Sequence, residues 1–370
     1  MKENKYLFAL IGLCLFLGLT SCAEDKRIFG DDIEIPELTD DNTVQFTVEV
    51  ASDWKQIEVI AGGGRMAIEW GDGRLQKVED PGTTGPINYK YGNRKSYRVR
   101  IWAEELDFLS VSGLLLPTTD LRMGYLPRMR SLNLNSFSGT TELDLSNSCP
   151  NVEDINIGNW TDLERLELNQ CKQLERADIY TNPRLTFLNI VNLPKLKDLN
   201  CAGNGLTALS LDGVPALRTL YCNNNPLTTI DLGDKMTIAG LYIQNCAFSS
   251  LAFLDKLPLL SEFSCRSNQL TTLDLSKHRS LRFLDCSFNK KMHHLSIPAN
   301  NQVQILRCHS CNLKANTLDA IFDALIALPK PSTPEHEKDY RISFYDNPGE
   351  NTCDVSILKN KNWYIDTNKN

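Results

Sequence analysis

A short phrase that returns every 21 or 22 residues constrains the fold of this chain more than any other feature. The phrase reads Leu-Lys-Asp-Leu-Asn-Cys at 196–201, Leu-Arg-Thr-Leu-Tyr-Cys at 217–222 and Leu-Arg-Phe-Leu-Asp-Cys at 281–286. Its last residue is apolar in eight successive repeats, at Ile157, Ile179, Cys201, Cys222, Ile243, Cys265, Cys286 and Cys308. A fixed period in this range predicts a solenoid, in which each repeat buries its apolar side against the next one.

Each period also holds a second apolar phrase and one polar position. Leu-x-x-Leu-x-Leu at 206–211 and 270–275 predicts a second extended edge on every coil. Asn or Cys recurs at one position, namely Asn182, Asn204, Asn225, Cys246, Asn268, Asn289 and Cys311. Because an Asn side chain both donates and accepts hydrogen bonds, this column is expected to bond the backbone where every coil bends.

Together these phrases resemble the leucine-rich repeat, L-x-x-L-x-L-x-x-N/C-x-L, over residues 129–314. The resemblance implies a mostly β solenoid of about nine coils, with a strand or extended turn at the back of each coil.

Five of the 12 cysteines occupy the last position of the repeated phrase. A residue that recurs in register is expected to serve packing, because a free Cys behaves as a small buried hydrophobe. Disulfides within this ladder remain an alternative, although side chains stacked in parallel rarely reach the required torsion angle.

The first residues predict export. Residues 1–5 form a charged segment that contains Lys2 and Lys5. Residues 6–19 form an apolar run that is shorter than a membrane span. The run ends in Leu-Thr-Ser-Cys22, which resembles the lipobox of bacterial lipoproteins and implies a signal peptide at 1–21 and lipidation of Cys22. The start of the mature chain, with Ala23, Glu24 and an acidic tether at 22–41, resembles that of Gram-negative surface lipoproteins. This resemblance implies that the protein is anchored in the outer membrane and exposed at the cell surface.

Residues 42–112 predict a small β-sandwich. Alternating apolar residues at 43–50 and 96–102 predict half-buried strands. The sequence Ile-Glu-Trp-Gly-Asp-Gly at 68–73 resembles the PKD-type immunoglobulin-like domain, and its Gly-Asp-Gly is interpreted as a hairpin turn rather than a cation or phosphate loop. Residues 113–128 form the expected junction and N-terminal cap, with a strand shared between sandwich and solenoid inside 106–126.

Residues 315–370 are expected to cap the other end of the solenoid. Apolar residues from Leu318 to Ile326 follow helical spacing, with Asn316 as the predicted N-cap. A strand at 341–345, a turn at 346–349 and a closing segment at 363–366 follow, and this tail resembles the ends of leucine-rich-repeat lipoproteins.

Charge and motifs argue against several functions. A net charge of -7 disfavours nucleic-acid binding, which needs clustered cations. No catalytic motif is recognisable, so the sequence predicts no enzyme and no cofactor. Cys308-x-x-Cys311 and His293-His294 suggest a metal site, but both thiols already hold structural positions in the repeat, so none is predicted.

The outer face of the main strands is the remaining candidate for function. If the ladder residues point inward, their neighbours point outward, and these include the predicted partner-binding residues Tyr180, Tyr221, Tyr242, Arg266, Phe283, Arg307 and His309. Exposed aromatic and Arg side chains are typical of binding hot spots. The alternative is that these pairs only stabilise neighbouring strands.

These observations predict a lipid-anchored, non-enzymatic recognition or adhesion protein that binds a protein partner on a host or neighbouring cell through this face. Two alternatives stay open: a glycan-binding lipoprotein of a nutrient-capture system, because aromatic rings stack on sugars, and a purely structural envelope protein.

Overall fold

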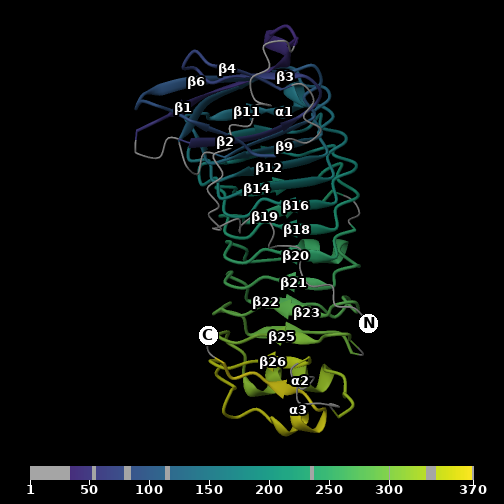
Figure 1. Cartoon of the computed structure of the whole chain (residues 1–370). Coiled ribbons are helices and arrows are strands. Elements are labelled where there is room, and N and C mark those ends of the chain that lie inside the picture. Colours follow the sequence, from purple (N-terminus) through teal and green to yellow (C-terminus); the bar gives the residue numbers. More distant parts are fainter. Residues whose placement is uncertain are drawn as a thin grey trace.

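The computed structural model describes residues 34–51, 56–78, 85–112, 117–233, 237–299, 301–330 and 339–368. The predicted lipidation site Cys22 and most of the acidic tether lie outside these residues. Figure 1 shows a stack of parallel coils with antiparallel sheets at one end and short helices at the other. Within the described residues, no helix is long and apolar enough to cross a bilayer.

The N-terminal sheets form because apolar and polar residues alternate along their strands. In β1, Val44, Phe46 and Val48 are fully buried, while Gln45, Thr47 and Glu49 stay partly exposed. The first sheet has six strands in the order β10-β8-β1-β6-β3-β4. After the 3-10 turn η1 (Asp40–Asn42), its strands are β1 (Thr43–Glu49), β3 (Met66–Glu69), β4 (Leu75–Val78), β6 (Ser96–Ala103), β8 (Thr118–Met123) and β10 (Phe137–Ser138).

The second N-terminal layer continues directly into the solenoid. Strands β2 (Gln56–Gly62), β5 (Ile87–Lys90) and β7 (Phe108–Ser112) begin a 14-stranded sheet, called the main sheet below. β7 pairs antiparallel with β2 and parallel with β9. β7 is therefore a shared strand inside the predicted region, whereas the apolar run at 114–116 lies outside the described residues.

Parallel, in-register strands make up the rest of the main sheet. Nine of them lie within residues 129–314, which agrees with the expected nine coils, and β26 and β27 of the expected cap also join, so that eleven follow β7 in the part that the structure describes. They are β9 (Ser131–Asn135), β12 (Asp154–Gly158), β14 (Arg176–Tyr180), β16 (Asp198–Asn200), β18 (Thr219–Tyr221), β20 (Gly240–Tyr242), β21 (Glu262–Ser264), β23 (Phe283–Asp285), β25 (Ile305–Arg307), β26 (Arg341–Ser343) and β27 (Tyr364–Ile365).

The predicted second edge is present as short strands at the back of most coils. These form three small sheets, with β11 (Glu142–Asp144), β13 (Arg165–Glu167) and β15 (Phe187–Asn189); β17 (Ala208–Ser210) and β19 (Thr229–Asp231); and β22 (Thr272–Asp274) and β24 (His294–Ser296). Between β19 and β22 the prediction of a strand or extended turn is wrong, because that coil carries the 3-10 turn η2 (Ala252–Lys256). Buried Leu251, Leu254 and Leu257 recur every third residue there, which matches the 3-10 period.

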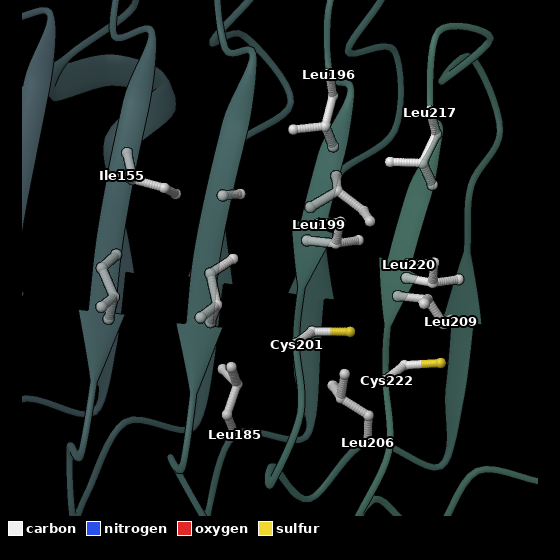
Figure 2. Close-up of a cluster of buried hydrophobic side chains, with 14 of the residues drawn as sticks. Ile155, Leu185, Leu196, Leu199, Cys201, Leu206, Leu209, Leu217, Leu220 and Cys222 are labelled. Atoms are coloured by element: carbon white, nitrogen blue, oxygen red, sulfur yellow. The ribbon is translucent and has the colours of Figure 1, made fainter. Parts of the chain in front are cut away.

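The core of the stack is a column of inward-pointing aliphatic and thiol side chains. All eight ladder residues from Ile157 to Cys308 are 0% exposed, which confirms the packing role predicted for them. Figure 2 shows Cys201 and Cys222 lying in parallel on neighbouring strands, between layers of Leu. The ten cysteines of the described residues are free thiols, and burial raises the pKa of the thiol of Cys222.

The Asn column bonds the backbone at each bend. The Asn225 side chain accepts from the Leu206 amide at 3.1 Å and donates to the carbonyls of Cys201 at 2.8 Å and Cys222 at 3.0 Å. Asn347, in the predicted tail turn, repeats this pattern for the last full coil. The residue before each column position has positive φ in coil after coil, so the chain turns in the same way each time.

The C-terminal cap contains the predicted helix and a second, unpredicted one. Helix α2 (Ala315–Ala324) begins after Lys314, so the prediction of Asn316 as N-cap is wrong. The Gly349 backbone packs directly against the amide of Ala315, which fixes the start of α2 by tertiary contact. Lys361, which follows the unpredicted helix α3 (Ser356–Asn360), donates to three carbonyls at the end of α2.

Candidate functional site

The outer face of the main sheet displays every second side chain of its strands. In β18, Leu220 points into the core and is fully buried, while Thr219 and Tyr221 lie outside and are half-buried. Five half-buried aromatic and arginine side chains come from this face of the consecutive strands β18, β20, β21, β23 and β25 or the residues just after them. They are Tyr221, Tyr242, Arg266, Phe283 and Arg307, and are called the aromatic–arginine patch.

The two tyrosines of the patch stack on each other. Their ring centroids are 4.3 Å apart and their planes differ by 8°. Because neighbouring strands lie about 4.8 Å apart, the ring normals follow the stack of strands and the ring edges face outward. The Tyr242 hydroxyl donates to Glu262, and burial, together with this carboxylate, raises its pKa.

The arginines of the patch lie over rings as well. The Arg266 guanidinium is 4.2 Å from the centroid of Phe288, and that of Arg307 is 5.8 Å from the centroid of Phe283. Arg307 also pairs with Asp285 at 3.6 Å. Such contacts fix long cationic side chains in one orientation.

His309 is the predicted site residue that the structure removes from the exposed surface. The expectation was an outward, accessible side chain, but His309 is only 4% exposed. It lies between the Tyr345 ring, stacked at 4.2 Å, and the edge of Phe288, and its pKa is lowered, chiefly by burial. Tyr345 belongs to the C-terminal cap, 36 residues further along the chain, so the repeat pattern could not predict that it would cover His309.

Phe288 is the residue of this region that the sequence analysis missed. It stands at the bend position with φ of 59°, a conformation that bulky residues rarely adopt. From there it contacts both Arg266 and His309. The only feature of the sequence that indicated its position was that it directly precedes Asn289 of the polar column.

Tyr180 is separate from the patch. One complete strand, β16, lies between it and Tyr221 in the main sheet. Tyr180 lies across Gly158 of the neighbouring strand, and its hydroxyl donates to Asn135 at 3.4 Å. A Cβ at position 158 would come within 2.5 Å of the Tyr180 ring, so only glycine allows this placement.

The face around Tyr180 is polar rather than aromatic. Asn133, Asn156, Asp178 and Asn200 succeed one another in register on neighbouring strands. Asn200 donates to Asp178 at 3.2 Å, and burial raises the pKa of the Asp178 carboxyl. The outer face therefore has a polar N-terminal half and an aromatic, cationic C-terminal half.

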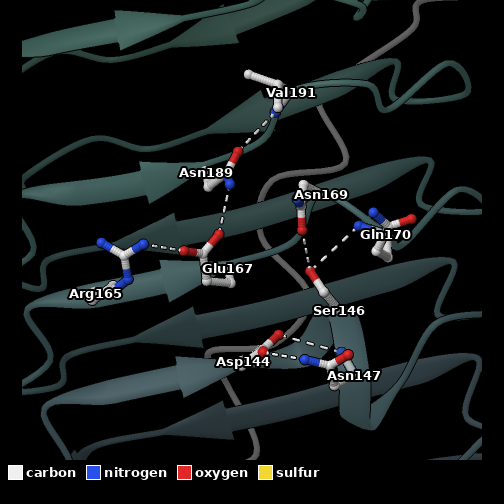
Figure 3. A network of polar contacts seen from close by, with 9 residues as sticks. All are labelled: Asp144, Ser146, Asn147, Arg165, Glu167, Asn169, Gln170, Asn189 and Val191. Atoms are coloured by element: carbon white, nitrogen blue, oxygen red, sulfur yellow. Dashed lines mark hydrogen bonds and ion pairs between the residues drawn. The ribbon is translucent and has the colours of Figure 1, made fainter.

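The back of the first coils is occupied by polar groups that satisfy one another. Figure 3 shows Glu167 held between Arg165 and Asn189, and Ser146 donating to Asn169 at 2.8 Å. These bonds link neighbouring coils and stabilise the stack.

The groups considered for metal binding do not meet. Cys308 and Cys311 are both buried within the coil, whereas His293 and His294 are exposed. No group of three or more potential metal-ligating side chains occurs within the described residues.

Comparison with known proteins shows which kind of repeat builds the solenoid. A sequence profile described as "Leucine Rich repeats (2 copies)" matches residues 194–234, which contain Cys201 and Cys222 of the ladder. The solenoid is built of leucine-rich repeats. Leucine-rich-repeat domains typically bind proteins and are usually non-catalytic. No curated protein matches this leucine-rich-repeat chain at a significant level.

Three solved structures match this chain at low sequence identity, and one of them reaches a TM-score of 0.50. One chain of the "Octameric complex of Latrophilin 3 (Lec, Olf), Unc5D (Ig, Ig2, TSP1) and FLRT2 (LRR)" superposes with a TM-score of 0.50 and 18% identity, over 65% of this chain and 76% of that one. An internalin (inlF) from Listeria monocytogenes gives 0.43 and 13%, over 71% and 86%. The functional domain of InlJ from Listeria monocytogenes, which includes a cysteine ladder, gives 0.27 and 18%, over 60% and 64%.

Proposed function

We propose that this chain is a non-enzymatic recognition or adhesion protein whose aromatic–arginine patch binds a protein partner. The observation that carries the proposal is the stacking of half-buried rings and cations on five consecutive strands of one rigid sheet. Tyr and Arg are, with Trp, the side chains enriched in binding hot spots.

The geometry of the patch lowers the entropic cost of binding. Tyr221 and Tyr242 are held against each other, and Arg266 and Arg307 lie over rings before any partner arrives. An interface loses about 0.5–1.5 kcal/mol for each flexible side chain that it must immobilise, so side chains already held in place lose less.

The orientation of the tyrosines favours a protein over a glycan. A sugar ring stacks on the open face of an aromatic ring. Here each tyrosine has one face covered by the other, and the opposite face is directed along the sheet. The exposed ring edges and hydroxyl groups suit the mixed apolar and polar contacts of a protein interface.

The comparison supports the same class of function. The FLRT2 (LRR) chain was solved in a complex with Latrophilin 3 and Unc5D, which are other proteins. The present chain shares the fold of that complex's matched chain, and its patch offers the surface for an analogous contact.

The proposal includes a location. The lipobox-like sequence at Cys22 and the acidic tether support a lipid anchor in the outer membrane, with the solenoid facing outward. Metabolic labelling with a fatty-acid analogue and protease shaving of intact cells test this. Cys22→Ser should abolish labelling and release the protein from the membrane fraction, and protection of the wild-type chain from protease would contradict surface exposure.

Photo-crosslinking of the full chain in its own cells tests the binding face. Phe283, in the patch, and Phe187, on back strand β15, are each replaced by benzoylphenylalanine, which changes the same residue type on opposite sides of the coils. We expect a discrete protein adduct from position 283 and none from position 187.

Tyr221→Ala with Tyr242→Ala should strongly reduce that adduct. Equal adducts from both positions, or none from position 283, would refute the assigned face. Patch-dependent hits on a glycan array without a protein adduct would favour the glycan-binding alternative, and no ligand of either class would favour the structural one.

A further inference from the structure

A shallow hollow lies at one edge of the main sheet, where the chain enters β16, β18, β20 and β21, which succeed one another in Figure 1. Its volume is about 410 Å³. The described residues that line it are Lys197, Ala216, Arg218, Thr237, Ala239 and Leu259.

The repeat itself explains why a hollow forms here. One position of the turn holds Lys195, Ala216, Thr237 and Leu259 in successive coils, and the position two residues later begins Lys197, Arg218 and Ala239. In the first column the small residues Ala216 and Thr237 lie between Lys195 and Leu259. In the second column Ala239 and the next member, Ser261, follow Arg218 and precede Arg282. The floor is rigid, because the Arg218 amide bonds the Lys197 carbonyl and the Ala239 amide bonds the Arg218 carbonyl, each at 2.8 Å.

The floor of the hollow is apolar. Ala216 and Ala239 contribute methyl groups, and the Thr237 hydroxyl proton is shared between the carbonyls of Pro215 and Leu217 in the preceding coil, so Thr237 has no proton left to donate to a ligand. Leu259 forms one wall and is 53% exposed, although its neighbours Leu257 and Leu260 are fully buried. Burial of a Leu side chain stabilises, and folding alone leaves about half of this one in contact with water.

The other wall is cationic. Lys197 is paired with Glu175 at 2.6 Å, whereas Arg218 has no ion pair among the residues that the structure describes. Among the residues that the structure describes, two cations and no carboxylate line the hollow, in a chain whose net charge is -7. A carboxylate beside an apolar side chain complements this arrangement, because an arginine binds a carboxylate through two parallel hydrogen bonds.

The hollow adjoins the aromatic–arginine patch. Arg218 and Ala239 precede Tyr221 and Tyr242 by three residues, which is about 10 Å along an extended chain. One partner surface can therefore cover both features.

We propose that the hollow seats an acidic segment of the protein partner, with an apolar side chain packed against Leu259 and a neighbouring carboxylate bound by Arg218. This inference rests on the proposed function and names the chemistry of the segment that is recognised. The patch supplies affinity through its rings, and the hollow selects partners with an Asp or Glu beside a Leu, Ile or Phe.

Selection from a library of random 12-residue peptides displayed on phage, against the full mature chain, tests the proposal. The expected outcome is enrichment of peptides in which Asp or Glu adjoins a large apolar residue. Synthetic versions should bind at least about tenfold more weakly to Arg218→Glu and to Leu259→Glu, and less tightly as salt rises.

Two matched variants control for charge and for loss of an exposed apolar side chain. Arg122→Glu makes the same charge change at an exposed residue of β8 in the N-terminal sheet, and Leu75→Glu alters another exposed leucine, in β4. Both should bind the selected peptides like the wild type. Circular dichroism of all four variants confirms that the fold is retained.

The outcomes separate this inference from the proposed function. If the affinity of the selected peptides is unchanged by Arg218→Glu and Leu259→Glu but is lost with Tyr221→Ala and Tyr242→Ala, the role of the hollow is refuted. The binding role of the patch is then still supported. Peptides without an acidic residue, or no selected peptide at all, would also refute the hollow. Adducts that persist at position 283 in cells would then still support the patch.

Discussion

Replacing Asn225 by Ala removes one member of the polar column and tests what holds the coils at their bends. Asn225 is 3% exposed, and its loss leaves the buried Leu206 amide without its partner. The Cys201 carbonyl keeps a hydrogen bond from Asn204 at 2.8 Å, but the Cys222 carbonyl retains only a thiol donor.

The expected magnitude follows from these separate losses. A buried amide without a partner costs about 1–3 kcal/mol, and the weakened bond to the Cys222 carbonyl adds about 1 kcal/mol, so Asn225→Ala should destabilise by about 2–4 kcal/mol. Asn225→Cys should cost about half as much, because Cys246 and Cys311 hold the same position and their thiols donate to carbonyls at 3.5 and 3.4 Å.

Urea unfolding followed by circular dichroism measures the loss, and hydrogen exchange locates it. Protection should fall at the amides of the coils around Asn225, because each repeat is stabilised mainly by its neighbours. Asn316→Ala, the same change at an exposed position of α2, is the control and should stay within about 0.5 kcal/mol of the wild type. An Asn225→Ala variant as stable as this control would refute a stabilising role for the column.

Three further changes test other parts of the molecule. Gly158→Ala places a methyl group where the Tyr180 ring lies, so we expect loss of the contact with Asn135 and a destabilisation of about 1–3 kcal/mol, whereas Gly85→Ala, in open space, should have little effect. Burial lowers the pKa of His309 in the folded chain, so below about pH 6.5 the unfolded chain binds more protons than the folded chain, and the free energy of unfolding should fall as the pH falls. His309→Gln should make the free energy of unfolding less dependent on pH, and an unchanged pH dependence would contradict this reasoning. Iodoacetamide should label half-buried Cys353 in the native protein well before Cys222, whose thiol is fully buried, and simultaneous labelling would contradict the packed ladder.

The repeat made the core and the bends predictable from sequence. Cys201 and Asn225 recur in register, so their neighbours along the stack follow from the period alone, and both occupy the positions that the pattern predicts. The same logic predicted that Tyr221 and Tyr242 would be neighbours on the outer face, as their stacking shows.

Contacts made outside the repeat could not be predicted in this way. His309 stands at a position of the repeat whose side chain points outward, but the ring of Tyr345 covers it. Tyr345 lies 36 residues further along the chain, after the regular repeat has ended, so the period does not predict this contact. The start of α2 is set by contact with Gly349 rather than by a local cap at Asn316. The hollow beside Leu259 depends on small side chains coinciding in neighbouring coils, which only the aligned stack shows.

The continuity of the main sheet through β7 has a mechanical consequence. Because β7 is hydrogen-bonded to both β2 and β9, the N-terminal sheets and the solenoid form one stiff body without a hinge at the strand they share. A pull between the proposed membrane tether and a partner bound to the patch would reach its first strand, β18, through five strand spacings, or about 24 Å, while the coils beyond the last patch strand, β25, carry little tension. Under load, the proposed contact would depend on the coils between β7 and the patch, and the coils after β25 would stay folded.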